Sequence, residues 1–276
     1  MSMPRKIRCT VESVVDHGER VYSVFLQPQS PVPAFKPGQF LHLTVDPFDP
    51  AGFWPESRVF SIASSPSDRK RLQVCYSVKG KYTTRMESVL APGLEVWAKL
   101  PYGEFVIAPD RDVVLIAGGT GISAFTAFLG ALTPAQARSV FLVYGARTPA
   151  LHLFRAEILD RLAAVPAFQA CFFAERDSAG EPGASPATAS SDGPAGATGA
   201  TPAAAPAAPR TAAPAAGRQP IALSGRIDLE AVWPLLPNPA ASVFYLSGPP
   251  VMLTALSDQL KARGLPADQV RLDAWE

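Results

Sequence analysis

The first part of the chain alternates apolar and polar residues in short runs that proline and glycine separate. Such runs are typical of β-strands with one buried face. The expected strands are 20–27, 39–45, 58–63, 72–78 and 94–99. Their regular spacing predicts a small antiparallel barrel.

From about residue 110 the pattern changes to continuous apolar runs, each followed by a stretch with helical periodicity. In the last of these stretches Leu253, Leu256 and Leu260 recur at spacings of three and four, which places them on one helix face. The expected strands are 113–117, 139–144, 170–174 and 242–246, and the expected helices are 123–132, 151–164 and 251–263. Strands that alternate with helices predict a parallel sheet.

The sequence therefore predicts two domains, an antiparallel β-barrel over residues 5–109 and an α/β domain over residues 110–276. A chain of 276 residues is long enough for two separate cores. Residues 178–218 are almost entirely Ala, Pro, Gly, Ser and Thr, which leaves nothing large and apolar to bury. We expect this tract to be a disordered insertion in the α/β domain, either passive or used for docking.

Charge and hydropathy exclude several classes of function. The net charge is +1, so the chain lacks the basic field that nucleic acids or anionic membranes require. Its longest strongly apolar run, residues 113–117, is far too short for a membrane span. Residues 1–9 contain no apolar segment typical of a secretory signal. We expect a cytoplasmic protein with no nucleic-acid partner and no membrane span.

Cysteine and histidine usage argues against a metal centre. The three cysteines and three histidines are Cys9, Cys75, Cys171, His17, His42 and His152. They are widely spaced and match neither a zinc site nor the four thiolates of an iron–sulfur cluster. We expect no bound metal, and thiols that stay reduced.

Two glycine-containing turns follow apolar strands and precede helices. The first contains Gly119, Thr120 and Gly121, and the second is Ser247-Gly248-Pro249. Such turns present backbone N–H groups and a helix N-terminus to a phosphate, although each alone could be a tight packing turn. Because ligands of an open parallel sheet lie at the carboxyl ends of its strands, both turns should line one crevice with Arg147.

The barrel half offers a charge and an aromatic plane on one strand. In Arg58-Val59-Phe60-Ser61, side chains alternate, so Arg58 and Phe60 face one side and Val59 and Ser61 the other. A guanidinium can hold a diphosphate while an aromatic ring stacks on a heterocycle. Gly80 to Thr83 precede the helical stretch 85–90, where a threonine could cap the helix or a phosphate could bind.

Five motifs occur in a fixed order along the chain, and this order is more specific than any one of them. They are Arg58 to Ser64, Gly80 to Thr84, Pro101 to Phe105, Gly118 to Ser123, and Ser247 to Met252. In this order they resemble the ferredoxin–NADP reductase family, and the similarity runs from Val11 to the C-terminus except for the Ala/Pro-rich tract. The resemblance implies an FAD-binding barrel followed by an NAD(P)-binding domain.

The resemblance also implies roles for residues of the barrel. Arg58 would bind the flavin diphosphate, Phe60 would pack on the isoalloxazine or ribityl, and Ser61 would lie near N5, with Val59 on the same strand. The family usually has tyrosine where Phe60 stands. The adenine diphosphate portion of FAD would contact a further group of residues, Cys75, Tyr76, Ser77, Gly80, Lys81, Tyr82 and Thr83. This set favours FAD over FMN.

In the α/β domain the resemblance assigns Thr120 and Gly121 to the pyridine nucleotide, and Ser247, Gly248 and Pro249 to the nicotinamide. Many relatives have cysteine where Ser247 stands. Ser61 and Ser247 are therefore the expected catalytic residues.

Two features of the α/β domain leave alternatives open. Trp275 could cover the flavin, as aromatic rings near the end of several relatives do, or anchor a final short strand. Glu175 and Asp177 favour NADH because a carboxylate repels a 2′-phosphate, whereas Arg147 and Arg176 argue for NADPH.

The function implied is a flavin-dependent NAD(P)H oxidoreductase. It would pass electrons from the nucleotide through FAD to a separate acceptor, such as a ferredoxin, a flavodoxin, an oxygenase component or a quinone. The departures at Phe60 and Ser247, with the insertion, leave one alternative, a non-catalytic flavin- or nucleotide-binding regulatory module.

Overall fold

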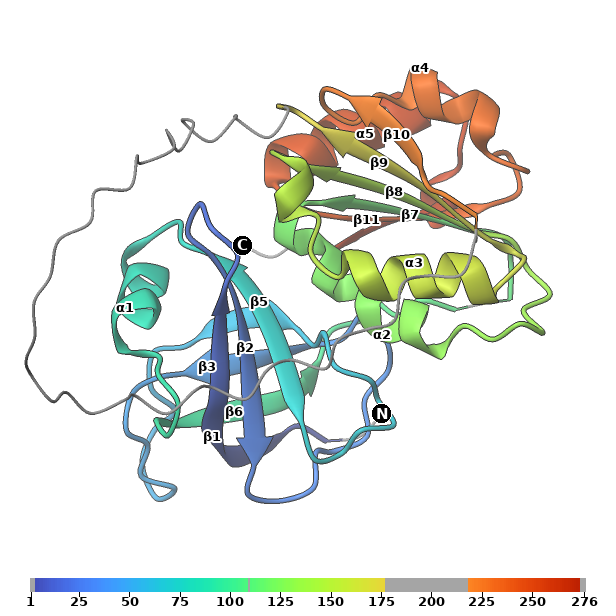
Figure 1. The fold of residues 1–276 in the computed structure, drawn as a ribbon. Helices are drawn as coiled ribbons and strands as arrows, with labels where there is room; N and C mark the ends of the chain where they lie inside the picture. The colour runs from blue at the N-terminus through green and yellow to red at the C-terminus, as the bar shows by residue number, and fades with distance from the viewer. Residues whose placement is uncertain (1–2, 109, 177–217, 274–276) are drawn as a thin grey trace, which may run out of the picture.

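The computed structural model describes residues 3–108, 110–176 and 218–273. They form two six-stranded sheets, one antiparallel and one parallel, that lie beside each other (Figure 1). The antiparallel sheet curves into a barrel with the strand order β4-β3-β6-β1-β2-β5. Its elements are β1 (Arg5–Asp16), β2 (Val21–Pro28), β3 (Phe40–Thr44), β4 (Arg58–Ser61), β5 (Leu72–Ser77), α1 (Lys81–Val89) and β6 (Glu95–Tyr102).

Each of the five strands expected in the barrel is present, and the structure adds β1. This strand pairs with both β2 and β6, so it lies near the middle of the sheet. Ile7, Cys9 and Val11 are buried on its inner face, and exposed Arg8 lies between them. The alternation was present in the sequence, but charged residues at the start of the strand obscured it.

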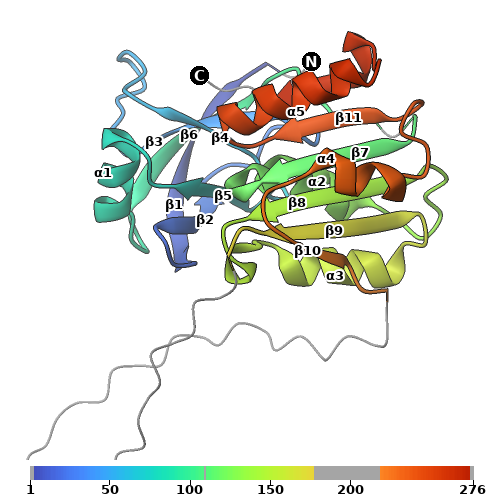
Figure 2. The same ribbon diagram turned by 90° about the horizontal axis from the view of Figure 1, so that it is seen from above.

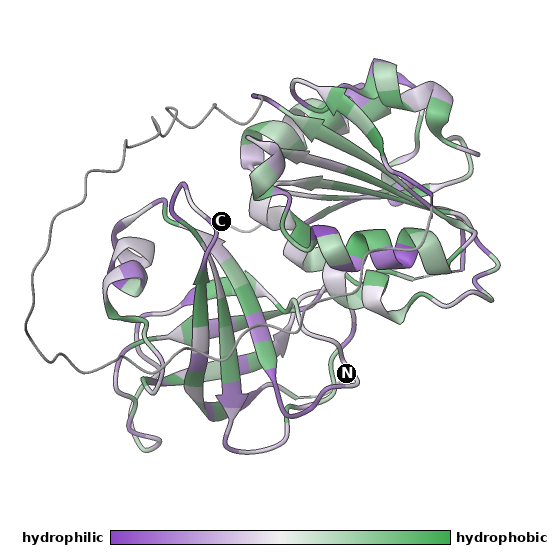
Figure 3. Ribbon diagram, viewed as in Figure 1, coloured by the Kyte–Doolittle hydropathy of each residue, from purple (hydrophilic) through white to green (hydrophobic). Residues whose placement is uncertain are grey.

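The barrel core consists of inward-facing side chains from every strand and from α1. Leu26, Leu41, Val74 and Leu100 are fully buried in it, and Met86 contributes from the helix. Hydrophobic residues concentrate on the strands of both sheets, while the connecting loops are more polar (Figure 3). Alternation of this kind buries one side of each strand and leaves the other for solvent or for a ligand.

The parallel sheet has the order β10-β9-β8-β7-β11-β12. Helices α2 and α3 cover one face and α4 and α5 cover the other (Figures 1 and 2). The strands are β7 (Val113–Gly118), β8 (Val140–Ala146), β9 (Phe168–Ala174), β10 (Ile221–Ser224), β11 (Val243–Ser247) and β12 (Val270–Asp273). The helices are η1 (Gly119–Ile122), α2 (Ser123–Ala131), η2 (Pro149–Leu151), α3 (Arg155–Ala164), α4 (Leu229–Val232), η3 (Trp233–Leu235), α5 (Pro250–Ala262) and η4 (Ala267–Gln269).

The strand and helix alternation predicted for this half is confirmed, and the structure adds the two edge strands and α4. Residues of β10 are mostly exposed, so no apolar run marks the strand in the sequence. The boundary between residues 109 and 110 stays a prediction. The last barrel strand ends at Tyr102 and the first parallel strand begins at Val113.

The two sheets share an apolar interface. Val21 and Cys75 of the barrel belong to the same buried cluster as Phe105 and Ile107 of the connecting segment and the residues under α2. A hydrogen bond crosses the interface, from Thr126 Oγ1 to the Ala63 carbonyl oxygen at 2.7 Å. These contacts place the end of β4 directly against α2.

The described helices include none that is long and apolar enough to cross a membrane. Within the same residues no group of three or more His, Cys, Asp or Glu side chains is arranged to hold a metal ion.

Candidate functional site

Arg58 is held in a fixed orientation at the start of β4. Its guanidinium lies over the Tyr82 ring, 4.7 Å from the centroid. It also donates to Glu56 Oε1 and to the Ser57 carbonyl oxygen, both at 2.8 Å. The side chain is still 45% exposed, so part of the guanidinium fork is available to a ligand. Planar stacking and a fork of donors suit a guanidinium to bind a diphosphate.

Tyr82 connects this arginine to the first turn of α1. Its buried hydroxyl donates to the Glu56 carbonyl oxygen at 3.0 Å and accepts from the Val45 amide at 3.1 Å. Arg58 and the N-terminus of a nine-residue helix therefore lie together. Both groups favour negative charge, because the helix dipole is positive at that end.

Backbone geometry at the start of α1 leaves room for an anion. Thr83 Oγ1 accepts from the Lys79 and Gly80 amides at 2.9 and 3.1 Å, and Lys81 is exposed beside them. A Cβ added at Gly80 would have no described atom within 4 Å. The backbone at Gly80 thus borders open space, two residues before the Tyr82 ring on which Arg58 stacks.

The rings of Phe60 on β4 and Tyr76 on β5 lie near each other, with their centroids 6.1 Å apart. The Tyr76 hydroxyl and the Ser64 hydroxyl are buried, and neither has a hydrogen-bond partner among the described residues. Burial also raises the pKa of Tyr76 above its ordinary value. Buried hydroxyls without partners are uncommon in folded proteins. These residues fit a flat, polar cofactor such as a flavin.

The remaining barrel residues are placed differently. Ser61 is buried opposite Phe40 of β3, Val59 is half-buried opposite His42, and Ser77 is half-buried at the end of β5. Cys75 faces away from Tyr76 into the interface between the sheets, where its Sγ lies 3.2 Å from Ser23 Oγ. Burial raises the pKa of this thiol to about 12. The structure does not bring the Cys75 side chain to Arg58 and Phe60.

On the α/β side the two glycine turns are in contact. A Cβ added at Gly121 would lie 2.3 Å from the Ser247 carbonyl oxygen and 2.7 Å from the Gly248 amide nitrogen. Gly248 has φ +156°, and a Cβ there would meet backbone atoms of Gly118 at 3.1 Å. Only glycine allows this approach. The turns after β7 and β11 therefore form one backbone surface.

Three further residues complete this surface. Thr120 is half-buried, and its carbonyl oxygen accepts from Ser123 Oγ at 2.8 Å. Gly119 has φ +54°, and a Cβ added there would have open space around it among the described atoms. Pro249 is the N-cap of α5. Since η1 also packs against β5, this surface faces the barrel.

Ser247 has a partner that the sequence reasoning missed. Its buried hydroxyl donates to Asp273 Oδ2 at 2.8 Å, and Asp273 is itself only 3% exposed. The two residues are register partners in the parallel pair β11 and β12. A lone aspartate near the end of a chain gives little signal, because it becomes informative only once β12 is known to pair with β11.

Arg147 and Arg176 follow the carboxyl ends of β8 and β9, and both contact Glu19 of the barrel. Glu175 instead lies 3.5 Å from Arg226, an exposed pair at the other side of the strand. Two predicted residues, Asp177 and Trp275, lie outside the described residues.

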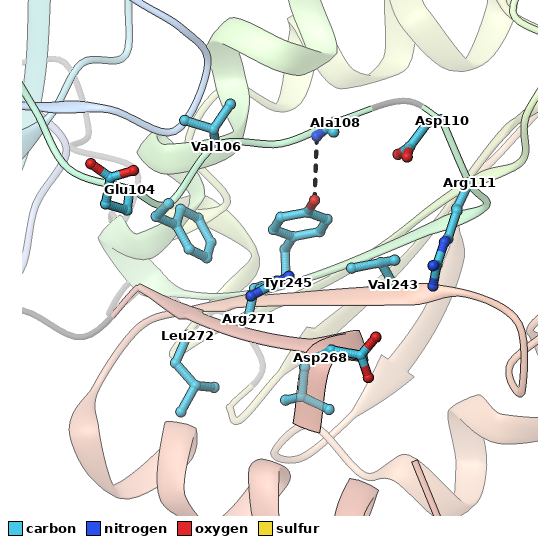
Figure 4. A pocket seen from close by; sticks show the side chains of 12 residues that line it. Glu104, Val106, Ala108, Asp110, Arg111, Val243, Tyr245, Asp268, Arg271 and Leu272 are labelled. Atoms are coloured by element: carbon cyan, nitrogen blue, oxygen red, sulfur yellow. Dashed lines mark hydrogen bonds between the residues drawn. The ribbon is translucent and has the colours of Figure 1, made fainter. Parts of the chain in front are cut away.

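A cavity of about 680 Å³ lies elsewhere, between the connecting segment and the edge formed by β11 and β12 (Figure 4). Tyr245 lines this cavity and is not one of the predicted site residues. Its hydroxyl accepts a hydrogen bond from the Ala108 amide at 3.3 Å. Val243 and Val270, which begin β11 and β12, line this cavity. It also extends along the strands to Tyr245 and Leu272, and the residues of the two glycine turns, where a nucleotide would bind, are not among those that line it.

Comparisons with known proteins agree with this arrangement. Residues 115–184 match the family model described as an oxidoreductase NAD-binding domain. An NAD(P)H-flavin reductase of Aliivibrio fischeri is 31% identical over 162 residues, covering 55% of this chain and 65% of that protein. The reductase component of a propane 2-monooxygenase of Rhodococcus jostii (strain RHA1) is 26% identical over 277 residues, covering 98% of this chain and 63% of that protein.

Among solved structures, an Amycolatopsis cytochrome P450 reductase superposes with a TM-score of 0.71 at 22% identity, over 98% of this chain and 69% of that chain. This likeness shows that the two-domain fold is shared. The curated relatives are longer than the matched region, and the alignments cover between 36% and 65% of their length. The fold, the ordered motifs and these matches are similar to those of the ferredoxin–NADP reductase family.

Proposed function

We propose that this protein is a flavin-dependent NAD(P)H oxidoreductase that passes electrons from a nicotinamide nucleotide through FAD to a separate acceptor. One observation carries the proposal. The barrel residues suited to a flavin and the glycine turns suited to a nucleotide lie on two domains that the Thr126 to Ala63 hydrogen bond joins. Two cofactors held on facing domains can react without a protein nucleophile or a metal.

In the barrel, Arg58 and the start of α1 would bind the FAD diphosphate, and Phe60 and Tyr76 would pack against its flat or ribityl portions. FAD, when bound, supplies a group that accepts a hydride and releases electrons singly or in pairs. Ser61 would lie near the reacting end of the flavin. Cys75 would pack in the interface between the domains and not contact the cofactor with its side chain, because its thiol is buried against Ser23.

In the α/β domain, Gly119, Thr120 and Gly121 would bind the nucleotide phosphates through their backbone. Ser247, Gly248 and Pro249 would border the nicotinamide. The hydrogen bond from Ser247 Oγ to Asp273 prevents the hydroxyl from rotating freely. The hydroxyl dipole would therefore have a fixed direction beside the nicotinamide. Ser247 is then a positioning residue for the nicotinamide.

The acceptor is a separate molecule in this proposal, either a protein such as a ferredoxin, a flavodoxin or an oxygenase component, or a quinone. The Rhodococcus relative supports an oxygenase component, because its name describes the reductase of a monooxygenase. The proposed location is the cytoplasm.

The first test is spectroscopic. The purified chain should be yellow, or become so with added FAD, and the flavin bands should bleach during anaerobic titration with NADH or NADPH. A colourless chain that FAD and FMN do not reconstitute would contradict the flavin assignment. A yellow chain that neither nucleotide bleaches would instead indicate a regulatory module.

Ser247→Cys tests the nicotinamide border separately. We expect the rate of flavin reduction to change by about tenfold, because a thiol is a poorer hydrogen-bond donor to Asp273 than a hydroxyl. Stopped-flow reduction at saturating nucleotide measures this rate, and Ser88→Cys, at an exposed position on α1, is the control. An unchanged rate would remove Ser247 from the mechanism.

A further inference from the structure

The turn between β1 and β2 has an unusual backbone. Gly18, Glu19 and Arg20 have φ values of +84°, +48° and +58°, so three consecutive residues are left-handed and two of them are not glycine. Non-glycine residues in this region are strained and persist only where their surroundings hold them. Here the Gly18 amide donates to Asp16 Oδ1 at 2.8 Å, and Arg20 forms an ion pair with Glu87.

The strained turn directs Glu19 across the interface between the domains. Its carboxylate lies 2.8 Å from Arg147 Nη1 and 3.2 Å from Arg176 Nη2. The Glu19 carbonyl oxygen accepts a further bond from Arg147 Nη2 at 3.2 Å. The two arginines are neighbours, because the Arg176 amide donates to the Arg147 carbonyl oxygen at 2.9 Å. Two guanidinium groups of one domain thus converge on one carboxylate of the other.

Convergent guanidinium groups are the chemistry that binds a phosphate monoester as well as a carboxylate. Arg147 and Arg176 follow the carboxyl ends of β8 and β9, the sheet edge outside which the adenosine half of a nucleotide lies in such domains. We propose that Glu19 sets the nucleotide preference: it occupies the two arginines that would otherwise bind a ribose 2′-phosphate, and thereby favours NADH over NADPH.

This inference rests on the proposed function and changes which residues explain the preference. Glu175, one of the two acidic residues that the sequence points to, is instead an exposed partner of Arg226. Glu19 is far from Arg147 in the sequence and comes from the flavin-binding barrel. Only the packing of the two domains brings its charge to the nucleotide side.

The test measures binding of 2′,5′-ADP, 5′-AMP and inorganic phosphate to the full chain by calorimetry, with no flavin reduction involved. Glu19→Gln keeps the size of the side chain but removes its charge. We expect 2′,5′-ADP to bind about tenfold more tightly to this variant, because a like charge beside the phosphate is removed, and 5′-AMP to bind equally to both proteins. Glu95→Gln, which breaks an ion pair with Arg8 on the barrel exterior, should change neither affinity.

Combining Glu19→Gln with Arg176→Gln should abolish the gain for 2′,5′-ADP, since one of the two converging cations is lost. In steady-state reduction, the ratio of kcat/KM for NADPH to that for NADH should rise about tenfold in Glu19→Gln. Unchanged affinity for 2′,5′-ADP would overturn the inference. So would an equal gain for inorganic phosphate, which would indicate a general anion site. Failure of the proposed function is a different result, in which neither nucleotide bleaches the flavin of the unmodified protein.

Discussion

The two domains present their candidate binding groups by different physical means. In the barrel these groups are side chains, with Arg58 stacked on Tyr82 and Phe60 packed beside Tyr76. In the α/β domain they are backbone groups of Gly121 and its neighbours, brought together because no Cβ intervenes. A partly exposed side chain can change without disturbing the core, whereas a close backbone contact is part of the fold. Binding and stability should therefore separate in the barrel and stay coupled in the α/β domain.

The largest effect is expected at Gly121, where binding and stability are most strongly coupled. In Gly121→Ala the new Cβ would meet backbone atoms of Ser247 and Gly248 at 2.3 to 2.7 Å, and backbone cannot move aside as a flexible side chain can. We expect the free energy of unfolding to fall by about 3 kcal/mol and nucleotide affinity to fall with it. Urea denaturation and nucleotide titration measure the two quantities.

Gly130→Ala is the matched control for this change. Gly130 lies in α2, and a Cβ there has no described atom within 4 Å. Alanine is the better helix former, so the control should gain about 0.5 to 1 kcal/mol of stability. Equal stability of the two variants would show that the turns do not pack as closely as the structure has them.

The second effect, at Arg58, should appear in binding alone. Arg58→Lys keeps the charge but loses the fork and the stacking on Tyr82. We expect FAD to bind about 10- to 100-fold more weakly, or about 1.4 to 2.8 kcal/mol. The unfolding free energy of the flavin-free protein should change by less than about 0.5 kcal/mol, since the Arg58 side chain is 45% exposed and its ion pair with Glu56 is on the surface.

Arg71 provides a close control, because it has the same kinds of contact outside the candidate site. It donates twice to Glu12 at 2.8 Å and lies 4.7 Å from the Phe25 ring centroid. Arg71→Lys should leave the FAD dissociation constant unchanged. Equal loss of FAD affinity in both variants would contradict a specific role for Arg58.

The same contrast explains what the sequence could reveal. Glycine turns after apolar strands carry their signal locally, so the surface around Gly121 and Gly248 was predictable from consecutive residues. The strand order was less accessible, and β1 was missed because Arg5, Lys6 and Arg8 obscure its alternation. Pairs made by tertiary packing leave no local pattern at all. Asp273 reaches Ser247 only through the pairing of β11 with β12, and Glu19 reaches Arg147 only through domain packing.

A third effect, smaller again, concerns a buried histidine of the α/β domain. Burial lowers the pKa of His152, whose Nε2 lies 3.0 Å from the Phe173 carbonyl oxygen. The folded protein therefore holds the ring neutral, while the unfolded chain binds a proton below its ordinary pKa of about 6.5. The contribution of the neutral ring to the free energy of unfolding is therefore complete above about pH 6.5 and is lost as the pH falls below it. The loss is about 1.4 kcal/mol for each unit by which the pKa is lowered.

Urea denaturation at pH 7.5 and pH 5.5 measures this loss, and His152→Phe should reduce it while keeping the stacking on Phe172. In the barrel, burial and the charge of Lys99 also lower the pKa of His42, but that side chain is only half-buried. His42→Phe should change the pH dependence less. A larger change in the pH dependence of stability for His42→Phe than for His152→Phe would contradict this expectation.

The smallest effect is expected at Phe60, where the family that the sequence resembles usually has tyrosine. Phe60→Tyr adds a hydroxyl to a half-buried ring that already lies beside Tyr76. One hydrogen bond to the flavin should raise FAD affinity about two- to tenfold, or about 0.5 to 1.5 kcal/mol. Fluorescence titration of the flavin-free protein measures this gain, and Phe25→Tyr on β2, under Arg71, should show none. Because the ring and its packing are retained, a loss of affinity in Phe60→Tyr would mean that the hydroxyl is buried without a partner, and hence that the flavin does not lie against this face of β4.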